Sequence, residues 1–395
     1  MITRPLSLLG VAAIATLALS GCVANNPGGG GNATTIDVVG NGDSCDVSTT
    51  TAPSGPVTFT MTNKGSDVSE FELLAEDGLR IISEKENIGP GTSASMTVSV
   101  PAGKYYTACV PGLVGQGVRA SFTVTDSGKA VTPTGSEKQQ IDAAATAYVG
   151  YVKDQVGQLV TGTAAFLQAY TSGDDATARS LYPGTRAYYE RIEPVAESFG
   201  DLDPKIDFRE ADVEQGTPWT GWHRIEKDLW QPSAADNGGV AYTPLTSAER
   251  ATLAEQLTTD TASLHDKVTA SDFTVGIDTI SNGAVGLLDE VATGKITGEE
   301  EIWSHTDLYD FQGNLEGARV AYEGVRDIVK TKDAKLVDQI DGKLTSLENL
   351  LATYGSLDTG FPAYTSLTDT DKRKLSDAVN ALSEPLSKLT TALVA

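Results

Sequence analysis

The sequence predicts a protein of two domains, in which an N-terminal β-sandwich precedes an all-α helical bundle. Residues 35–126 are rich in β-branched residues and turn formers, whereas Ala, Leu, Asp, Glu and Lys dominate at helical spacing from residue 141 onward. The chain has 395 residues, and 40% of them are hydrophobic. This length is sufficient for two separate cores, because single domains usually contain about 100 to 200 residues.

Residues 1–22 have the features of an export signal. Arg4 is followed by an apolar run from Leu6 to Leu19, which is too short to span a bilayer comfortably. The run ends on Leu19-Ser20-Gly21-Cys22, which resembles a bacterial lipobox and implies a lipid on the Cys22 thiol. The alternative is an ordinary secretory signal with a chance cysteine. We therefore expect an extracytoplasmic protein, anchored to the bacterial cell membrane through Cys22 and a glycine-rich tether over residues 23–34.

The net charge argues against nucleic acid as a partner. The chain has 29 Lys and Arg against 53 Asp and Glu, which gives a formal charge of −24. Such a charge repels phosphate backbones and attracts cations. We expect no nucleic-acid partner.

Short alternating runs of residues predict the strands of the sandwich. The clearest runs are Val57–Met61, Ser69–Leu73 and Met96–Val100, in which β-branched or apolar residues alternate with polar ones. Turn formers such as Asn-Lys-Gly and Pro-Ala-Gly separate such runs at close intervals. Short strands at this spacing are typical of a β-sandwich.

The segment Pro101–Leu113 resembles the cupredoxin pattern, in which an aromatic strand leads to a cysteine and then to a Pro-Gly turn. The resemblance implies a cupredoxin-like fold for residues 35–126. The two positions that hold histidine in that family are Ser69 and Leu113 here, and residues 35–126 contain no histidine. Because a blue-copper centre needs two imidazoles and a thiolate, we expect no type 1 copper site.

Two cysteines, Cys45 and Cys109, remain after the lipobox. An even pair in an exported protein is compatible with a structural disulfide, which an oxidising compartment favours. The alternative is a second metal site, in which the two thiolates join the carboxylates of Glu70 and Glu72. Both interpretations stay open at this point.

Residues 127–140 are polar, contain Pro133 and Gly135, and are predicted to form a linker. Residues 141–395 then form the predicted helical domain. Its apolar residues recur at helical spacing, which predicts an antiparallel bundle. The helices are expected near residues 141–171, 245–270, 314–330, 333–354 and 369–393.

The stretch Gly221–Trp230, GWHRIEKDLW, is predicted to lie on a helix with Thr217 as its N-cap and Pro232 beyond its end. At about 100° per residue, His223 and Glu226 share a face with three tryptophans, while Arg224, Lys227 and Asp228 point elsewhere. That face carries Trp219, Trp222, His223, Glu226 and Trp230. A carboxylate buried there needs a partner, because an unpaired buried charge costs several kcal/mol.

The residues alone do not identify the partner of this His-Glu pair. It is either the pair's own hydrogen bond, an arginine from a neighbouring helix, or a metal ion. Further acidic segments provide context for the third case. They are Tyr188–Pro194, Gly200–Lys205, Asp289-Glu290 and Gly298–Leu308.

Together with His223 and Glu226, these segments resemble the imelysin-like domain, also called the peptidase M75 family, as found in EfeO-type iron-uptake lipoproteins. The resemblance covers about residues 141–395. It implies a metal site inside the bundle, in which Glu190, Asp203 and Glu290 join His223 and Glu226. One imidazole with several carboxylates suits iron or manganese better than copper(I).

The resemblance also implies a function. It is that of the iron-binding component of an EfeUOB-like uptake system, which captures ferrous or ferric ion and passes it to a membrane permease. A haem peroxidase is implied as a further partner, and another divalent metal is the alternative cargo.

An exported metallopeptidase that uses the same His-x-x-Glu pair is the competing hypothesis. The chain lacks His-Glu-x-x-His and Gly-x-Ser-x-Gly motifs, so catalysis is not expected. The other two histidines, His265 and His305, are predicted to lie on a helix surface and at a helix start. A weaker hypothesis, a polysaccharide-binding bundle, requires Tyr189 and Trp222 to be exposed.

Overall fold

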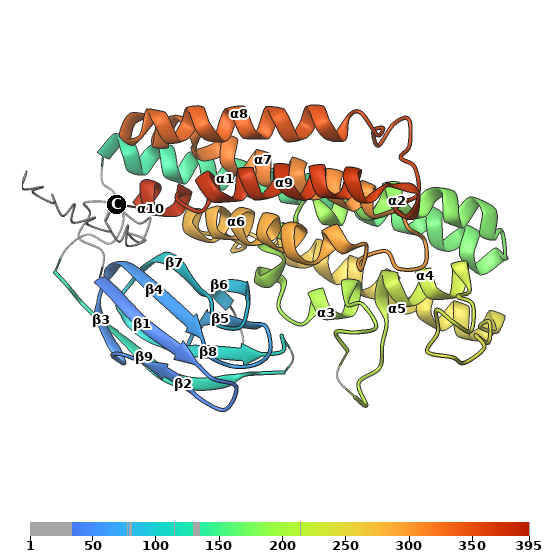
Figure 1. Ribbon diagram of the computed structural model, residues 1–395, viewed down its shortest axis with the longest axis horizontal. Helices are drawn as coiled ribbons and strands as arrows, with labels where there is room; N and C mark the ends of the chain where they lie inside the picture. Colours follow the sequence, from blue (N-terminus) through green and yellow to red (C-terminus); the bar gives the residue numbers. More distant parts are fainter. Residues whose placement is uncertain are drawn as a thin grey trace, which may run out of the picture. The chain divides into compact units, whose positions relative to one another are not determined.

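The computed structural model describes residues 34–76, 78, 81–113, 115–128, 135–213 and 215–394. The lipobox, Cys22 and residues 23–33 of the predicted tether lie outside the described residues, as do residues 129–134 of the predicted linker. Within the described part, strands occupy the region up to residue 125 and helices follow from residue 135 (Figure 1). The predicted fold class, a β-sandwich followed by an all-α region, is confirmed.

The strands of the described residues form two sheets. One sheet has the order β2-β1-β4-β7, and the other has the order β3-β9-β8-β5-β6. The first contains β2 (Cys45–Val47), β1 (Thr34–Gly40), β4 (Gly55–Asn63) and β7 (Ser93–Val100). The second contains β3 (Thr51–Pro53), β9 (Val118–Thr125), β8 (Gly103–Pro111), β5 (Ser69–Leu74) and β6 (Ile81–Ile88).

The core of the sandwich lies between the two sheets. Strand β4 alternates buried and half-buried residues along its whole length, as its sequence predicts. Phe59 of β4 meets Phe71 and Phe122 of the other sheet, with ring centroids 5.1 Å and 5.4 Å apart. These aromatic contacts hold the sheets face to face.

Cys45 and Cys109 form a disulfide that joins a strand of one sheet to a strand of the other, with their Cα atoms 5.5 Å apart. This is the first of the two interpretations of the cysteine pair. Because the two sulfur atoms are bonded to each other, they do not act as thiolate ligands beside Glu70 and Glu72 in this structure.

All five predicted helical segments are helical. The long helices run alongside one another, and α7 (Asp307–Lys332) contacts α1, α2, α6 and α8 (Figure 1). The other helices are α1 (Gly135–Ser172), α2 (Asp175–Glu190), α3 (Leu202–Asp207), α4 (Gly221–Trp230), α5 (Ser247–Thr269), α6 (Ile277–Thr293), α8 (Ala334–Leu351), α9 (Asp369–Leu386) and α10 (Leu389–Val394). Short 3-10 turns are η1 (Glu193–Phe199), η2 (Lys295–Thr297) and η3 (Tyr364–Ser366). No helix among the described residues is both long and apolar enough to span a membrane.

Helix α6 is absent from the predicted set, because its glycines and β-branched residues have low helix propensity. Tertiary packing explains one of these glycines. A Cβ atom on Gly283 would lie 1.7 Å from the carbonyl oxygen of Pro194, so only glycine lets α6 approach η1 this closely.

Helix α6 also contacts the sandwich, and the described residues of both regions belong to one compact unit. The side-chain amide of Asn282 donates to Ser83 Oγ at 2.7 Å and to the Thr97 carbonyl at 2.8 Å. Lys85 of β6 forms an ion pair with Asp289 of α6. The helix that carries Glu290 is therefore held against the sandwich.

Removal of the disulfide is expected to destabilise the sandwich. The bond closes a loop with a sequence separation of 64, for which the chain-entropy account gives a loss of about 4 kcal/mol of unfolding free energy. Denaturant unfolding of the protein with Cys45→Ser and Cys109→Ser, compared with the parent, measures this loss. If both thiols of the unfolded parent react with a thiol reagent before any reductant is added, the bond does not form and this expectation is wrong.

Candidate metal centre

Helix α4 (Gly221–Trp230) carries the histidine of the predicted site and begins later than the sequence pattern predicts. Its N-cap is Thr220 and not Thr217. Gly221 has a φ of 85°, and a Cβ atom there would lie 2.2 Å from the carbonyl oxygen of Ile206. Because side-chain-bearing residues rarely adopt this left-handed conformation, the helix does not extend backward through Gly221. Its end at Trp230 agrees with the prediction.

The helix is buried on more sides than its sequence predicts. Trp222, His223 and Glu226 are buried as expected, but Lys227 and Asp228, predicted to point elsewhere, are buried too. Their polar groups have partners. Lys227 pairs with Glu210, and the carboxylate of Asp228 accepts hydrogen bonds from the hydroxyls of two tyrosines, Tyr170 and Tyr242, at 3.0 Å each. Hydrogen bonding makes this burial tolerable.

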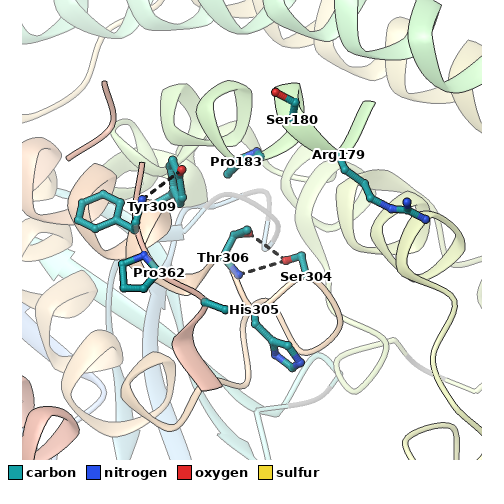
Figure 2. Close-up of a pocket in the computed structure, with 10 residues that line it drawn as sticks. Arg179, Ser180, Pro183, Ser304, His305, Thr306, Tyr309 and Pro362 are labelled. Atoms are coloured by element: carbon teal, nitrogen blue, oxygen red, sulfur yellow. Dashed lines mark hydrogen bonds between the residues drawn. The ribbon is translucent and has the colours of Figure 1, made fainter. Parts of the chain in front are cut away.

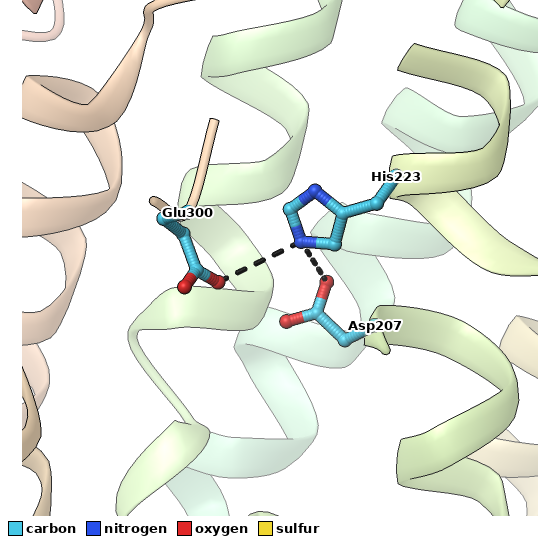
Figure 3. A group of neighbouring side chains, drawn as sticks. All are labelled: Asp207, His223 and Glu300. Carbon is cyan, nitrogen blue, oxygen red and sulfur yellow. Dashed lines mark ion pairs between the residues drawn. The ribbon is translucent and has the colours of Figure 1, made fainter. Parts of the chain in front are cut away.

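His223 has carboxylate oxygens near both ring nitrogens. On one side, Nδ1 lies 3.4 Å from Glu226 Oε2 and 3.9 Å from Glu301 Oε1. On the other, Nε2 lies 3.7 Å from Asp207 Oδ1 and 3.6 Å from Glu300 Oε1 (Figure 3). In each set of three residues the candidate ligand atoms lie within 4.8 Å of one another. An imidazole with two carboxylates is a ligand set for a hard or borderline metal ion.

Neighbouring groups orient the carboxylates on the Nδ1 side. Glu226 Oε1 accepts the backbone N–H groups of Trp303 at 3.1 Å and Ser304 at 2.7 Å, which leaves Oε2 directed at His223. The hydroxyl of Ser304 also donates to Glu301 Oε2 at 2.6 Å. A single turn at residues 301–304 thus fixes two of the candidate ligands.

Two buried cations lie among the acidic residues. Arg186 is 0% exposed and forms ion pairs with Glu190 and Asp207, and its Nε lies 2.7 Å from Glu301 Oε1. Lys295 is 3% exposed, and its Nζ lies 3.2 Å from Glu190 Oε2, 2.8 Å from Glu193 Oε1 and 3.7 Å from Glu300 Oε1. These cations neutralise part of the acidic cluster, as burial of charge requires.

Residues 144–389 match the imelysin family, and residues 10–124 match the cupredoxin-like domain. The chain belongs to the imelysin family. An iron uptake system component EfeO of Escherichia coli (strain K12) is 36% identical over 348 residues, which cover 87% of this chain and 88% of that protein. An Efem/EfeO family lipoprotein of Staphylococcus aureus (strain MSSA476) is 42% identical over 255 residues, which cover 64% of this chain and 85% of that protein. The pairing of a cupredoxin-like with an imelysin domain makes the chain EfeO-type.

The neighbouring charges and burial determine the pKa values of His223 and the acidic residues beside it. Burial and the Arg186 guanidinium act to lower the pKa of His223, but the neighbouring carboxylates of Glu226 and Glu300 outweigh them and raise this pKa to about 9. Burial acts to raise the pKa of Glu300, yet Lys295 and His223 hold it well below its ordinary value. His223 is therefore protonated at neutral pH, and a metal ion that binds it displaces a proton.

The three other predicted ligands lie around this cluster. Glu190 is 0% exposed and is bound by Arg186, Lys295 and the side-chain amide of Asn314, at 2.8 Å for the last. Glu290 is half-buried near the end of α6, and burial raises its pKa to about 8 against the opposing charge of Lys295. Both share cations with the cluster without belonging to either His223 set.

Asp203 accepts a hydrogen bond from the hydroxyl of Tyr189, and burial raises the pKa of Asp203 to about 7. It belongs to neither His223 set among the described residues. Asp207, one helical turn further along α3, is the aspartate next to His223. The aspartate beside His223 therefore lies two residues beyond the predicted segment Gly200–Lys205.

Sequence reasoning did not nominate Asp207, Glu300, Glu301 or Arg186. A run such as Glu299-Glu300-Glu301 usually indicates a solvated loop, yet Glu300 and Glu301 are 5% and 0% exposed. The aromatic residue at Trp303, itself buried, was the available signal that this run turns inward.

The histidines outside the cluster occupy different surroundings. The side chain of His265 is 43% exposed, as predicted for a helix surface. His305 precedes α7 and, with Ser304 and Thr306, lines a cavity of about 280 Å³ (Figure 2). Tyr189 and Trp222 are both 0% exposed, so the polysaccharide hypothesis, which needs them at the surface, is wrong.

Three acidic residues also gather on the sandwich. Candidate ligand oxygens of Glu70, Glu84 and Glu86 lie within 4.8 Å of one another. Glu72 is 7% exposed beside them, and burial raises its pKa above the ordinary value. Of the predicted carboxylate pair, Glu70 therefore belongs to this acidic group and Glu72 does not, and the group does not include the cysteines.

The free energy of unfolding, measured with a metal chelator present, is expected to fall as pH rises from about 5 to about 9. His223, Glu290, Asp203 and Asp307 have folded-state pKa values raised to about 9, 8, 7 and 6. Each binds a proton more tightly in the folded than in the unfolded chain, so stability is lost as pH rises through these values. The lowered pKa values of Glu226 and Glu300 act only below about pH 4.5.

Denaturant unfolding at several pH values measures this dependence. The substitution His223→Gln is expected to flatten the curve between about pH 7 and about pH 9, whereas the control His265→Gln leaves it unchanged. A free energy of unfolding that stays constant or increases over this interval contradicts the assigned protonation states.

Proposed function

We propose that this chain is the iron-binding component of an extracytoplasmic uptake system, which captures ferrous or ferric ion beside His223 and passes it to a membrane permease. The observation that carries the proposal is one buried imidazole with carboxylate oxygens near both ring nitrogens. The E. coli relative, named as an iron uptake component, supports iron as the cargo.

The ligand chemistry supports an ion of this kind. Oxygen-rich sites with one imidazole suit iron and manganese, whereas copper(I) prefers sulfur ligands. Glu226, Glu301, Asp207 and Glu300 supply oxygens next to His223. Glu190, Asp203 and Glu290 form a surrounding acidic layer in this proposal, and the chain-wide charge of −24 attracts cations toward it.

The proposal includes the setting of the protein. A lipid on Cys22 anchors it to the outer face of the cell membrane, as the name of the S. aureus relative supports. A permease receives the ion, and a haem peroxidase is a further partner. Another divalent ion with oxygen preference, such as Mn²⁺, is the alternative cargo.

Burial of the site favours ion binding over peptide hydrolysis. His223 is 1% exposed and Glu226 is 0% exposed, so a small ion fits beside them more readily than a peptide bond. A hydrolytic metal site also keeps an open position for water and substrate, usually with more than one imidazole. The metallopeptidase remains the second hypothesis.

Combined substitution of His223→Ala and Glu226→Ala is expected to weaken iron binding by more than about 100-fold, because residues that merely orient a ligand already contribute about 10- to 100-fold. Anaerobic titration with Fe²⁺ measures the affinity, with His265→Ala as the matched control outside the cluster. Equal affinity of the double variant and the parent would falsify the proposal. Peptide cleavage by the iron- or zinc-loaded parent that disappears in Glu226→Ala would favour the peptidase.

A further inference from the structure

Arg186 and a bound ion would share the same oxygen atoms. Asp207 Oδ1 pairs with Arg186 and lies 3.7 Å from His223 Nε2. Glu300 Oε1 lies 3.6 Å from Arg186 Nη2 and 3.6 Å from His223 Nε2. Glu301 Oε1 lies 2.7 Å from Arg186 Nε and 3.9 Å from His223 Nδ1. The guanidinium therefore lies beside at least one oxygen atom in each of the two candidate ligand sets.

This overlap makes Arg186 a competitor of the cargo. A metal ion beside His223 needs these oxygens as ligands, and a second positive charge a few ångströms away opposes it in a buried site. The opposition is reduced only if the guanidinium can turn toward other carboxylates. Two candidates lie within its range, Glu190 and Asp310.

Asp310 has the properties of such an alternative partner. It lies on α7 with 1% exposure, and its Oδ1 is 3.6 Å from Arg186 Nε. Neither of its carboxylate oxygens has a hydrogen-bond partner among the described residues. Buried carboxylates rarely lack hydrogen-bond partners, so the presence of Asp310 at this position needs an explanation. It belongs to neither of the two ligand sets around His223.

We propose that Arg186 is an exchangeable internal cation that sets the affinity and charge selectivity of the site, with Asp310 as its holding partner. On ion binding, the guanidinium releases the oxygens of Asp207, Glu300 and Glu301, keeps Glu190, and pairs with Asp310. When the ion is released, the guanidinium returns to the oxygens of Asp207, Glu300 and Glu301. The inference rests on the proposed function of ion capture beside His223.

Two consequences follow for the cargo. The ion binds less tightly than the acidic residues alone would allow, which suits a protein that must hand it on. A monovalent cation brings no more charge than the guanidinium it displaces and lacks its directional hydrogen bonds. Arg186 therefore selects ions of higher charge.

The substitution Asp310→Asn tests the role of the holding partner. It preserves size and removes the group that can carry a negative charge opposite Arg186, so the affinity of the purified full-length protein for Mn²⁺ and for anaerobic Fe²⁺ is expected to fall at least about tenfold. Thermal unfolding without added metal is expected to change little. The control is Asp341→Asn, which removes the partner of Arg326 outside the cluster and should leave the affinity unchanged.

A double-mutant cycle separates this role from a structural one. Arg186→Gln removes the competitor, so the variant is expected to bind Mn²⁺ more tightly than the parent although it is less stable without metal. In that background, Asp310→Asn should have no further effect, because Asp310 acts through Arg186. If Arg186→Gln does not fold, the metal affinity of Asp310→Asn, compared with that of Asp341→Asn, is the test of the exchange.

The outcomes separate the two proposals. Parent-like or tighter binding by a folded Asp310→Asn variant overturns the exchange, as does a tenfold loss that persists in the Arg186→Gln background. In both cases the parent still binds the ion, and the proposed function stands. If the parent itself binds neither Mn²⁺ nor Fe²⁺, the proposed function fails and the exchange fails with it.

Discussion

The buried guanidinium of Arg186 is the interaction around which the imelysin domain is organised. It contacts carboxylates from α2, from the end of α3, from the turn before α7 and from α7 itself. A buried charge without partners costs several kcal/mol, so these segments must meet around it. The contacts at Glu301 and Asp310 thus join Arg186 to residues that lie more than 100 positions away along the chain. The packing of the helices and the neutralisation of this buried charge therefore depend on each other.

The same carboxylates serve stability and the proposed ion site. Each acidic side chain next to His223 also lies near a buried cation or a backbone donor, as Glu226 does at the turn that contains Ser304. Such satisfied polar networks hold ligands in position before an ion arrives. They also limit affinity, because the ion must replace interactions that already exist. A protein that captures and releases its cargo needs both properties.

Local patterns in the sequence were sufficient for much of the fold. Alternation over Val57–Met61 predicts a strand with one buried face, and helical spacing predicts the helices of the bundle, because period 2 and period 3.6 each follow from backbone geometry. The pattern fails at α6, where Gly283 is retained for close packing on η1 and lowers the helical signal. It also misplaces the start of α4, which Gly221 fixes through a contact with Ile206.

The sequence by itself determined that His223 and Glu226 share a buried face of one helix, since side-chain direction along a helix follows from spacing alone. It did not determine which acidic residues lie opposite. Asp203 and Asp207 share one face of α3, and only the position of that helix against α4 puts Asp207 next to the imidazole. Glu300, Glu301 and Arg186 enter from other segments. Tertiary structure decided these neighbours, because the distance between two elements depends on how their side chains pack and not on the period of either one.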